Sequence, residues 1–156
     1  MTNKIIGEEK IYELALEEKR HHEQRRDEIN GHYISLFAAI IAVAPFINNI
    51  VEAVPGSYEG LVVRASLTIL SSIGLLLAII WLANLKRILF LIEYLDKVTL
   101  DLEKKNDIKF KIDLFNELDK KGSPDRITKY QLMMPRMFII IFSIIIIYSL
   151  SWIIIK

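Results

Sequence analysis

MFIIIFSIIIIYSLSWIII, residues 137–155, is the stretch that decides the fold, because it runs for nineteen residues without a charge. At about 1.5 Å of rise per residue, a helix of this length would measure roughly 28 Å, close to the hydrocarbon thickness of a bilayer. A helix that is apolar on every face has no polar side to turn toward water. The sequence therefore predicts a membrane-spanning helix at residues 136–156.

Two further runs have the composition of membrane spans. Residues 61–85 are interrupted only by Arg64, and residues 33–50 are apolar as far as Ile47. Of the 156 residues, 53% are hydrophobic and 25% are charged, so charge and hydrophobicity lie in different stretches. We expect an all-α membrane protein with three transmembrane helices, cytoplasmic helical extensions and no separate soluble domain.

The distribution of basic residues predicts the orientation. Residues 1–32 hold six Lys and Arg and residues 86–136 hold twelve, whereas residues 48–63 hold none. Basic residues in short loops remain on the cytoplasmic side. We therefore expect a multi-pass protein of the bacterial inner (plasma) membrane, with its N-terminus in the cytoplasm and its C-terminus outside.

Four segments follow from these patterns. They are a cytoplasmic N-terminal helix (1–31), a transmembrane hairpin (32–85, with spans 32–50 and 61–85), a cytoplasmic helical region (86–135) and the third transmembrane helix (136–156). Asn30-Gly31 is a candidate break before the first span, and Pro45 is expected to kink or end that span. Val-Pro-Gly-Ser at residues 54–57 predicts a tight turn outside the membrane.

The cytoplasmic region is expected to continue the second span as one helix from Leu61 to Lys105, because apolar residues recur at helical spacing. A lone helix would leave a stripe of these exposed to water, namely Leu91, Leu95, Val98 and Leu102. Residues 108–121 alternate like a strand but have no partner strand, so a helix is favoured there. Ser123-Pro124-Asp125 is typical of a helix start, and Pro135 is expected to break that helix at the membrane surface.

One weak metal-binding pattern is present. Glu18 and His22 have i,i+4 spacing and could hold an ion, but two ligands do not complete a site, so a charge-paired helix surface is favoured. The sequence has no catalytic set, phosphate loop or zinc signature, and no cysteine. We expect no catalytic residue, no cofactor and no metal, and hence no enzyme. The net charge of +1 gives no reason to expect nucleic acid.

Arg64 is a charge inside a predicted span, and such charges often mark function. It lies about one turn from the outer end of the span, so reaching the headgroups or pairing with Glu59 is favoured over lining a pore. Tyr33 and Trp81 are expected near the inner membrane interface and Trp152 near the outer one, where aromatic side chains form belts.

Small residues are concentrated in the first two spans. Ala38 and Ala42 in one span, and Gly74 and Ala78 in the other, have the spacing that lets helix backbones approach closely, and Ser71 adds to the second set. The third span is mostly isoleucine and is expected to face lipid or to lie at the periphery. The small residues either close a hairpin within one chain or also pack helices of different chains. We expect self-association through the first two spans, extended by residues 86–105.

The layout also supports a resemblance. It consists of the hairpin, Trp81 at its cytoplasmic exit, a long charged helix ending near Leu102-Glu103, and a proline-led third span at Met134-Pro135-Arg136-Met137-Phe138. In these features the chain resembles the RipA-type family of small octameric bacterial membrane proteins, which implies a homo-oligomer of eight copies. The first two spans and the next helix are also similar to SLATT domains, the two-span effector modules of bacterial nucleotide-signalling conflict systems. The third span departs from that second pattern, and neither resemblance implies a catalytic motif.

Two function classes follow, both with the lipid bilayer and further copies of the chain as partners. The first is a homo-oligomeric membrane assembly that acts as a pore or a membrane-perturbing effector. The second is a scaffold or regulator whose cytoplasmic helices recruit a soluble protein partner. A ring of polar side chains facing the oligomer axis would support the pore, and an apolar axis would support the scaffold.

Overall fold

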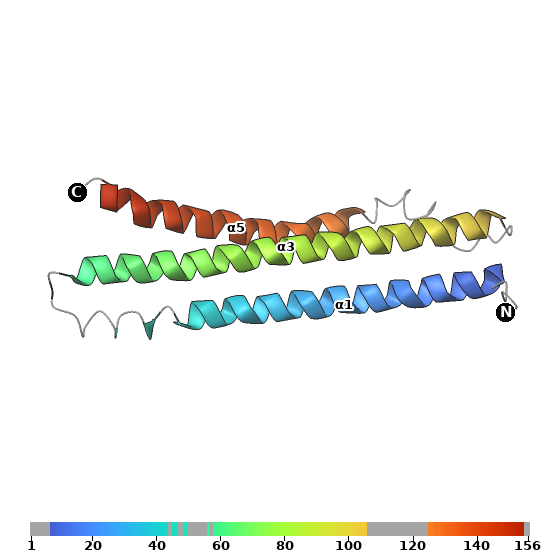
Figure 1. Cartoon of the computed structure of the whole chain (residues 1–156), viewed down its shortest axis with the longest axis horizontal. Helices are drawn as coiled ribbons and strands as arrows, with labels where there is room; N and C mark the ends of the chain where they lie inside the picture. Colours follow the sequence, from blue (N-terminus) through green and yellow to red (C-terminus); the bar gives the residue numbers. More distant parts are fainter. Residues whose placement is uncertain are drawn as a thin grey trace, which may run out of the picture. The chain divides into compact units, whose positions relative to one another are not determined.

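The computed structural model describes the backbone at residues 7–43, 45, 46, 49, 56, 58–105 and 125–154, and these residues are helical except for Gly7, Pro45, Gly56 and Tyr58. The side chains of residues 125–129 and 152–154 fall outside this description. Three helices are present there: α1 (Glu8–Val43), α3 (Glu59–Lys105) and α5 (Asp125–Ile154) (Figure 1). The all-α prediction is confirmed for these residues. The expectations for residues 108–121 and for the ring of Trp152 lie outside the described part.

Helix α1 is a single helix of 36 residues, so the candidate break at Asn30-Gly31 is wrong. Glycine lowers helix stability by about 1 kcal/mol relative to alanine, which neighbouring turns can offset. Asn30 is held in place by a contact to α3 that is described below. The helix ends at Val43, two residues before Pro45, in line with an end of the first predicted span near that proline.

Helix α3 runs for 47 residues, and the prediction of one helix as far as Lys105 is confirmed. At its start the backbone N–H groups of Leu61 and Val62 each donate to the carbonyl of Tyr58, at 3.0 Å. Lys104 and Lys105 occupy its last turn, where positive charge interacts favourably with the negative end of the helix dipole.

Helix α5 runs for 30 residues and contains Pro135, so the expectation that Pro135 breaks this helix is wrong. A proline inside a helix has no N–H to donate to the carbonyl four residues earlier, here that of Gln131. That loss weakens a helix without ending it where packing holds both sides. Pro135 is among the most deeply buried residues, so its ring is packed.

The chain divides into two compact units, and α1, α3 and α5 each contribute to both. We call residues 29–83 and 132–156 the aromatic unit, and residues 1–28 and 84–131 the charged unit. In the aromatic unit, α3 runs antiparallel to both α1 and α5. In the charged unit, α1 and α3 are again antiparallel, because Glu8 pairs with Lys105 and Lys19 with Asp96.

Candidate functional site: two packed units with different chemistry

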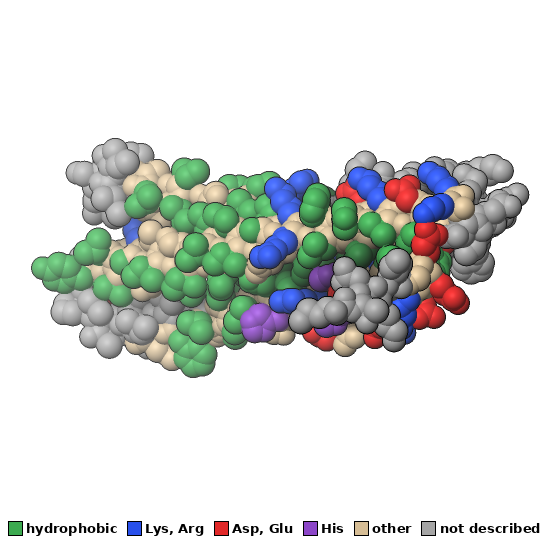
Figure 2. Space-filling view, turned by 45° about the vertical axis from the view of Figure 1, so that its right-hand side comes forward, with side chains coloured by type: hydrophobic (Ala, Val, Ile, Leu, Met, Phe, Trp, Pro, Cys, Tyr) green, Lys and Arg blue, Asp and Glu red, His purple; other side chains and the backbone are tan. Residues whose placement is uncertain are grey.

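Apolar side chains on the surface of the aromatic unit identify the environment of the protein. Helix α3 and residues Tyr130–Ser151 of α5 are long and apolar enough to cross a membrane. Only 22% of the most apolar stretch of α3 and 17% of that of Tyr130–Ser151 is buried, whereas a core helix of a soluble protein would be mostly buried. Figure 2 shows hydrophobic side chains over much of the visible surface. A surface of this kind requires lipid or another apolar partner.

The interior of the aromatic unit is a cluster of five aromatic rings from three helices. Tyr33 and Phe37 come from α1, Trp81 from α3, and Phe138 and Phe142 from α5. The rings of Phe37 and Phe138 stack with centroids 4.3 Å apart, and those of Tyr33 and Trp81 with centroids 5.5 Å apart. Since each helix supplies at least one ring, the cluster ties the three helices together.

Trp81 is the centre of this cluster and has an exposed fraction of only 1%. Its indole Nε1–H donates to Oδ1 of Asn30 at 2.9 Å, so the one polar group of the ring is satisfied inside the protein. Tyr33 is also buried. Neighbouring helices cover both rings, so they do not form an exposed aromatic belt, and their expected level near the inner membrane interface stays a prediction.

The three small residues of α3 that the sequence singled out for helix packing face the interior of the aromatic unit. Ser71, Gly74 and Ala78 are buried. A Cβ atom at Gly74 would lie 2.5 Å from Cζ of Phe142, so only glycine leaves room for this ring. In this contact the isoleucine-rich third helix packs directly on α3.

The small residues of α1 are placed differently. Ala38 and Ala42 are exposed on the aromatic unit, next to exposed Ile34 and Ile41. They are therefore not buried within the described part of their own chain. Two patterns with the same spacing in the sequence therefore occupy an interior face on α3 and an outer face on α1.

Hydroxyl groups inside the aromatic unit bond to one another and to backbone. Thr68 Oγ1 donates to the carbonyl of Arg64 at 2.8 Å and lies 2.7 Å from Oγ of buried Ser149 on α5. Ser149 Oγ also lies 3.1 Å from the same carbonyl. Arg64 itself is half-buried. In lipid no water is present to satisfy such groups, and internal bonding takes its place.

Polar and charged side chains link α1 to α3 in the charged unit. Tyr12 donates from its hydroxyl to Oε1 of Glu103 at 2.7 Å, and Lys19 Nζ lies 2.7 Å from Oδ1 of Asp96. Lys105 forms a third link, to Glu8. Glu103 has an exposed fraction of 0%, and partial burial together with this carboxylate raises the pKa of Tyr12 to about 12.

Apolar packing in the charged unit uses a different stripe of α3 from the one singled out in the sequence. The buried side chains are Leu85, Ile88 and Ile92, and buried Ala15 on α1 belongs to the same unit. The predicted stripe of Leu91, Leu95, Val98 and Leu102 is half-buried. Buried Thr99 and Glu103 continue the spacing of the first stripe, and this regular spacing is the signal that sequence reasoning missed.

The metal-binding pattern on α1 stays incomplete in the described part of the chain. Glu18 Oε2 and His22 Nε2 lie 3.9 Å apart, which is a loose ion-pair distance. Among the described residues, no three His, Cys, Asp or Glu side chains gather into a possible metal site.

The comparisons agree with this description of a helical membrane protein. The model of the octameric membrane protein family (8xMP) matches residues 9–151. The match covers almost the whole chain, so the chain belongs to the octameric membrane protein family, and the resemblance to small octameric membrane proteins is confirmed. No curated protein and no solved structure matches the chain.

Proposed function

We propose that this chain crosses the bacterial inner membrane three times, N-terminus inside and C-terminus outside, and assembles into an octameric scaffold. In this proposal the assembly conducts no ions, catalyses no reaction and presents its charged units to a soluble protein partner. Two findings support assembly within a membrane. The family is named for octameric membrane proteins, and the aromatic unit has exposed apolar faces.

The observation that favours a scaffold over a pore is that the Ser and Thr hydroxyl groups of the spans bond within the chain. Thr68 and Ser149 bond to each other inside the chain. Exposed Ser35 and Ser72 donate to carbonyls of their own helices, those of Gly31 and Thr68, at 2.9 and 2.7 Å. The described outer faces of the spans therefore offer mostly apolar carbon, whereas a water-filled pore needs a polar lining.

A pore remains the second candidate because of Arg64. It is a charge within the apolar part of α3 and is half-buried. Charges at such positions often line pathways for ions. In an octamer, eight copies of Arg64 around the axis would favour anions.

The two candidates differ in mass and in ion flux, which can be measured on the same purified protein. We expect the mass of the detergent-solubilised particle to be eight times 18.1 kDa, and proteoliposomes to show no anion flux above that of empty vesicles. Flux in the wild type that is lost in Arg64→Gln would support the pore and contradict the scaffold. A monomeric mass would contradict both.

The exposed Ala38 and Ala42 supply the matched variants for assembly. Replacing both with Leu adds bulk on the exposed outer face of α1, so a smaller particle would show that this face packs against another copy. Ile41→Leu, on the same exposed face, preserves volume and should keep the wild-type mass.

A further inference from the structure

The outward face of α3 in the charged unit carries large aromatic side chains among charges. Phe90 and Tyr94 have exposed fractions of 67% and 58%, and exposed Arg87 and Lys97 lie three residues before and after them. This spacing of three and four residues places all four side chains on one side of the helix. Two exposed rings at adjacent turns, outside the apolar run, mark a surface that binds something.

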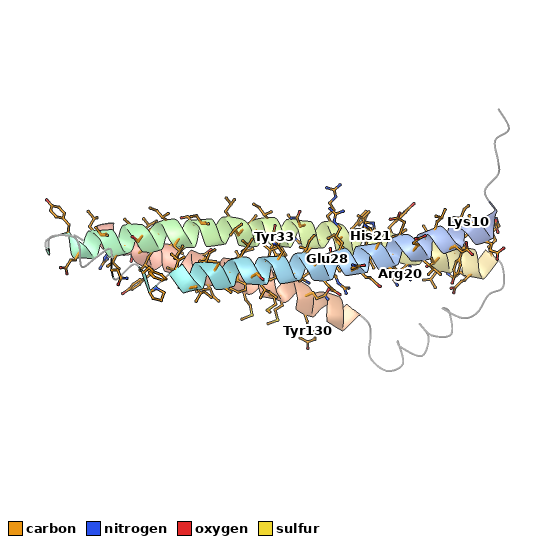
Figure 3. All side chains as sticks on the ribbon, turned by 90° about the horizontal axis from the view of Figure 1, so that it is seen from below. Lys10, Arg20, His21, Glu28, Tyr33 and Tyr130 are labelled. Carbon is orange, nitrogen blue, oxygen red and sulfur yellow. The ribbon has the colours of Figure 1, made fainter. Side chains whose placement is uncertain are left out.

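The outward face of α1 in the same unit has the opposite character. At the same spacing this face carries four exposed side chains, all polar or charged, namely Glu17, Arg20, Gln24 and Asp27. Tyr12, Ala15 and Lys19, which point toward the interior or α3, lie on the other side of the helix. Figure 3 shows Arg20 and Glu28 along this part of α1.

The links within one chain determine which residues of α1 and α3 lie at the same level. The contacts Tyr12–Glu103 and Lys19–Asp96 each join residues at one height of the antiparallel pair. A step forward along α1 from these contacts corresponds to an equal step back along α3, because the two helices are antiparallel. To within one residue, this correspondence gives three further pairs of equal height. These are Glu17 with Lys97, Arg20 with Tyr94, and Asp27 with Arg87.

We propose that in the oligomer the outward face of α3 of one copy packs against the outward face of α1 of the next. This inference rests on the proposed self-assembly and names the faces that form it. Rotation about an axis parallel to the two helices preserves height, so it brings the three pairs of equal height together across each interface. Two of these pairs join opposite charges, and in the third Arg20 meets the ring of Tyr94, a favourable cation–π contact.

The charges on these faces favour a second copy over other occupants. Arg87, Glu17 and Arg20 form no hydrogen bond or ion pair with any described residue of their own chain. Among the described residues, Lys97 pairs only with Glu93 and Asp27 only with Arg26, each a neighbour on its own helix. Lys97, Glu93 and Asp27 are exposed in these pairs. An anionic lipid surface would match only the basic residues, whereas the α1 face supplies a partner of the right sign at each level.

A head-to-tail contact of this kind also suits a closed ring. It joins two different faces of the same chain, so every copy donates one face and receives on the other. No face then remains unpaired when the ring closes.

Disulfide formation between substituted cysteines tests the contact, because the natural sequence contains no cysteine. A disulfide requires Cα atoms about 4.4–6.8 Å apart. Within one chain positions 17 and 97 lie on faces that point away from each other, so a bond between them must join two copies. The membrane-embedded variant Glu17→Cys/Lys97→Cys should therefore give a ladder of covalent multimers on mild oxidation. The matched control Glu17→Cys/Arg87→Cys moves the second cysteine about 15 Å along α3 and should give none.

The mass before oxidation separates this inference from the proposed function. An oligomeric mass, with a ladder in Glu17→Cys/Lys97→Cys and none in the control, supports the contact. An oligomeric mass with no ladder, or with equal ladders in both variants, contradicts the contact and leaves the octamer standing. A monomeric wild type contradicts both. If a cysteine variant fails to assemble, Glu17→Lys and Lys97→Glu decide: each alone should reduce the particle mass, and the two together should restore it. Failure to restore the mass contradicts the contact.

Discussion

The aromatic unit and the charged unit use the same two helices but hold them together by different chemistry. In the aromatic unit, stacked rings and one indole hydrogen bond join α1 to α3. In the charged unit, the links are Lys19–Asp96, Tyr12–Glu103 and Glu8–Lys105. The change falls between Asn30 and Lys19 on α1, within three turns of one unbroken helix.

This difference is the one expected if, as proposed, the aromatic unit lies in lipid and the charged unit in water. Lipid tails are as apolar as the protein interior, so burial of apolar surface contributes little to helix association there, and shape and internal hydrogen bonds decide the packing. In water, apolar burial and paired charges both contribute, which suits Leu85, Ile88 and Ile92 beside the polar links. The unit outside the apolar runs should therefore respond to pH, and the aromatic unit to changes of shape.

The largest effect is expected from Trp81→Ala, which removes the centre of the aromatic cluster. The change leaves a cavity between three helices and an unpaired Asn30 amide, and we expect a loss of about 3–5 kcal/mol in the free energy of unfolding. Denaturation of the solubilised protein measures it. Tyr148→Ala removes a ring that is 77% exposed and serves as the control. Equal losses in the two variants would show that the aromatic cluster does not stabilise the unit.

Gly74→Ala tests shape in the same unit with a smaller change. The added methyl would overlap the ring of Phe142, and overpacking of this kind costs about 1–3 kcal/mol. Gly31→Ala is the matched control, since nothing lies within 4 Å of a Cβ there. It should stabilise α1 by about 0.5–1 kcal/mol, because alanine favours the helix. A second change, Phe142→Leu, should recover part of the loss in Gly74→Ala, and a loss in both glycine variants alike would argue against the overlap.

The smallest effect is expected from Tyr12→Phe, and the pH dependence that distinguishes it from the wild type is confined to pH values above 10. The pKa of Tyr12 is raised from 10.0 to about 12 in the folded protein, chiefly by burial and further by Glu103. The folded state therefore favours the neutral phenol, and the resulting stability is complete below pH 10 and is lost as the pH rises toward about 12. Helix content of the wild type and of Tyr12→Phe, followed over this range in denaturant, measures the difference.

Tyr130→Phe removes an exposed phenol of the same unit and controls for the loss of a hydroxyl. If wild type and Tyr12→Phe lose stability along the same curve, the hydrogen bond to Glu103 does not hold the phenol neutral.

Much of the fold could be predicted from the sequence, because composition and period act over long stretches. The charge-free run at residues 137–155 and the periodic run ending at Lys105 determine two helices, and both are present. The errors are local. Gly31 and Pro135 weaken a helix by amounts that packing on both sides exceeds, so a rule based on single residues overestimates them.

The partners of the small residues could not be predicted. An isoleucine-rich helix has similar side chains on all faces, so its sequence does not show which side turns toward α3. The pairing of Gly74 with Phe142 therefore becomes visible only in three dimensions. Likewise, nothing in the sequence around Asn30 showed that it would accept a hydrogen bond from an indole fifty-one residues away.

Two of the contacts of α5 with α3, Phe142 on Gly74 and Ser149 with Thr68, fix the position of α5 along α3. A helix made of isoleucine could slide along its neighbour or roll about its own axis with little change in energy. The Phe142 ring and the Ser149 hydroxyl lie seven residues apart on α5, which is about 10 Å along the helix axis. Sliding or rolling of α5 would therefore break one contact or both. Helix α5 thus has a defined position along α3 and a defined rotation that its uniform sequence would not provide, and these determine which of its faces is turned outward.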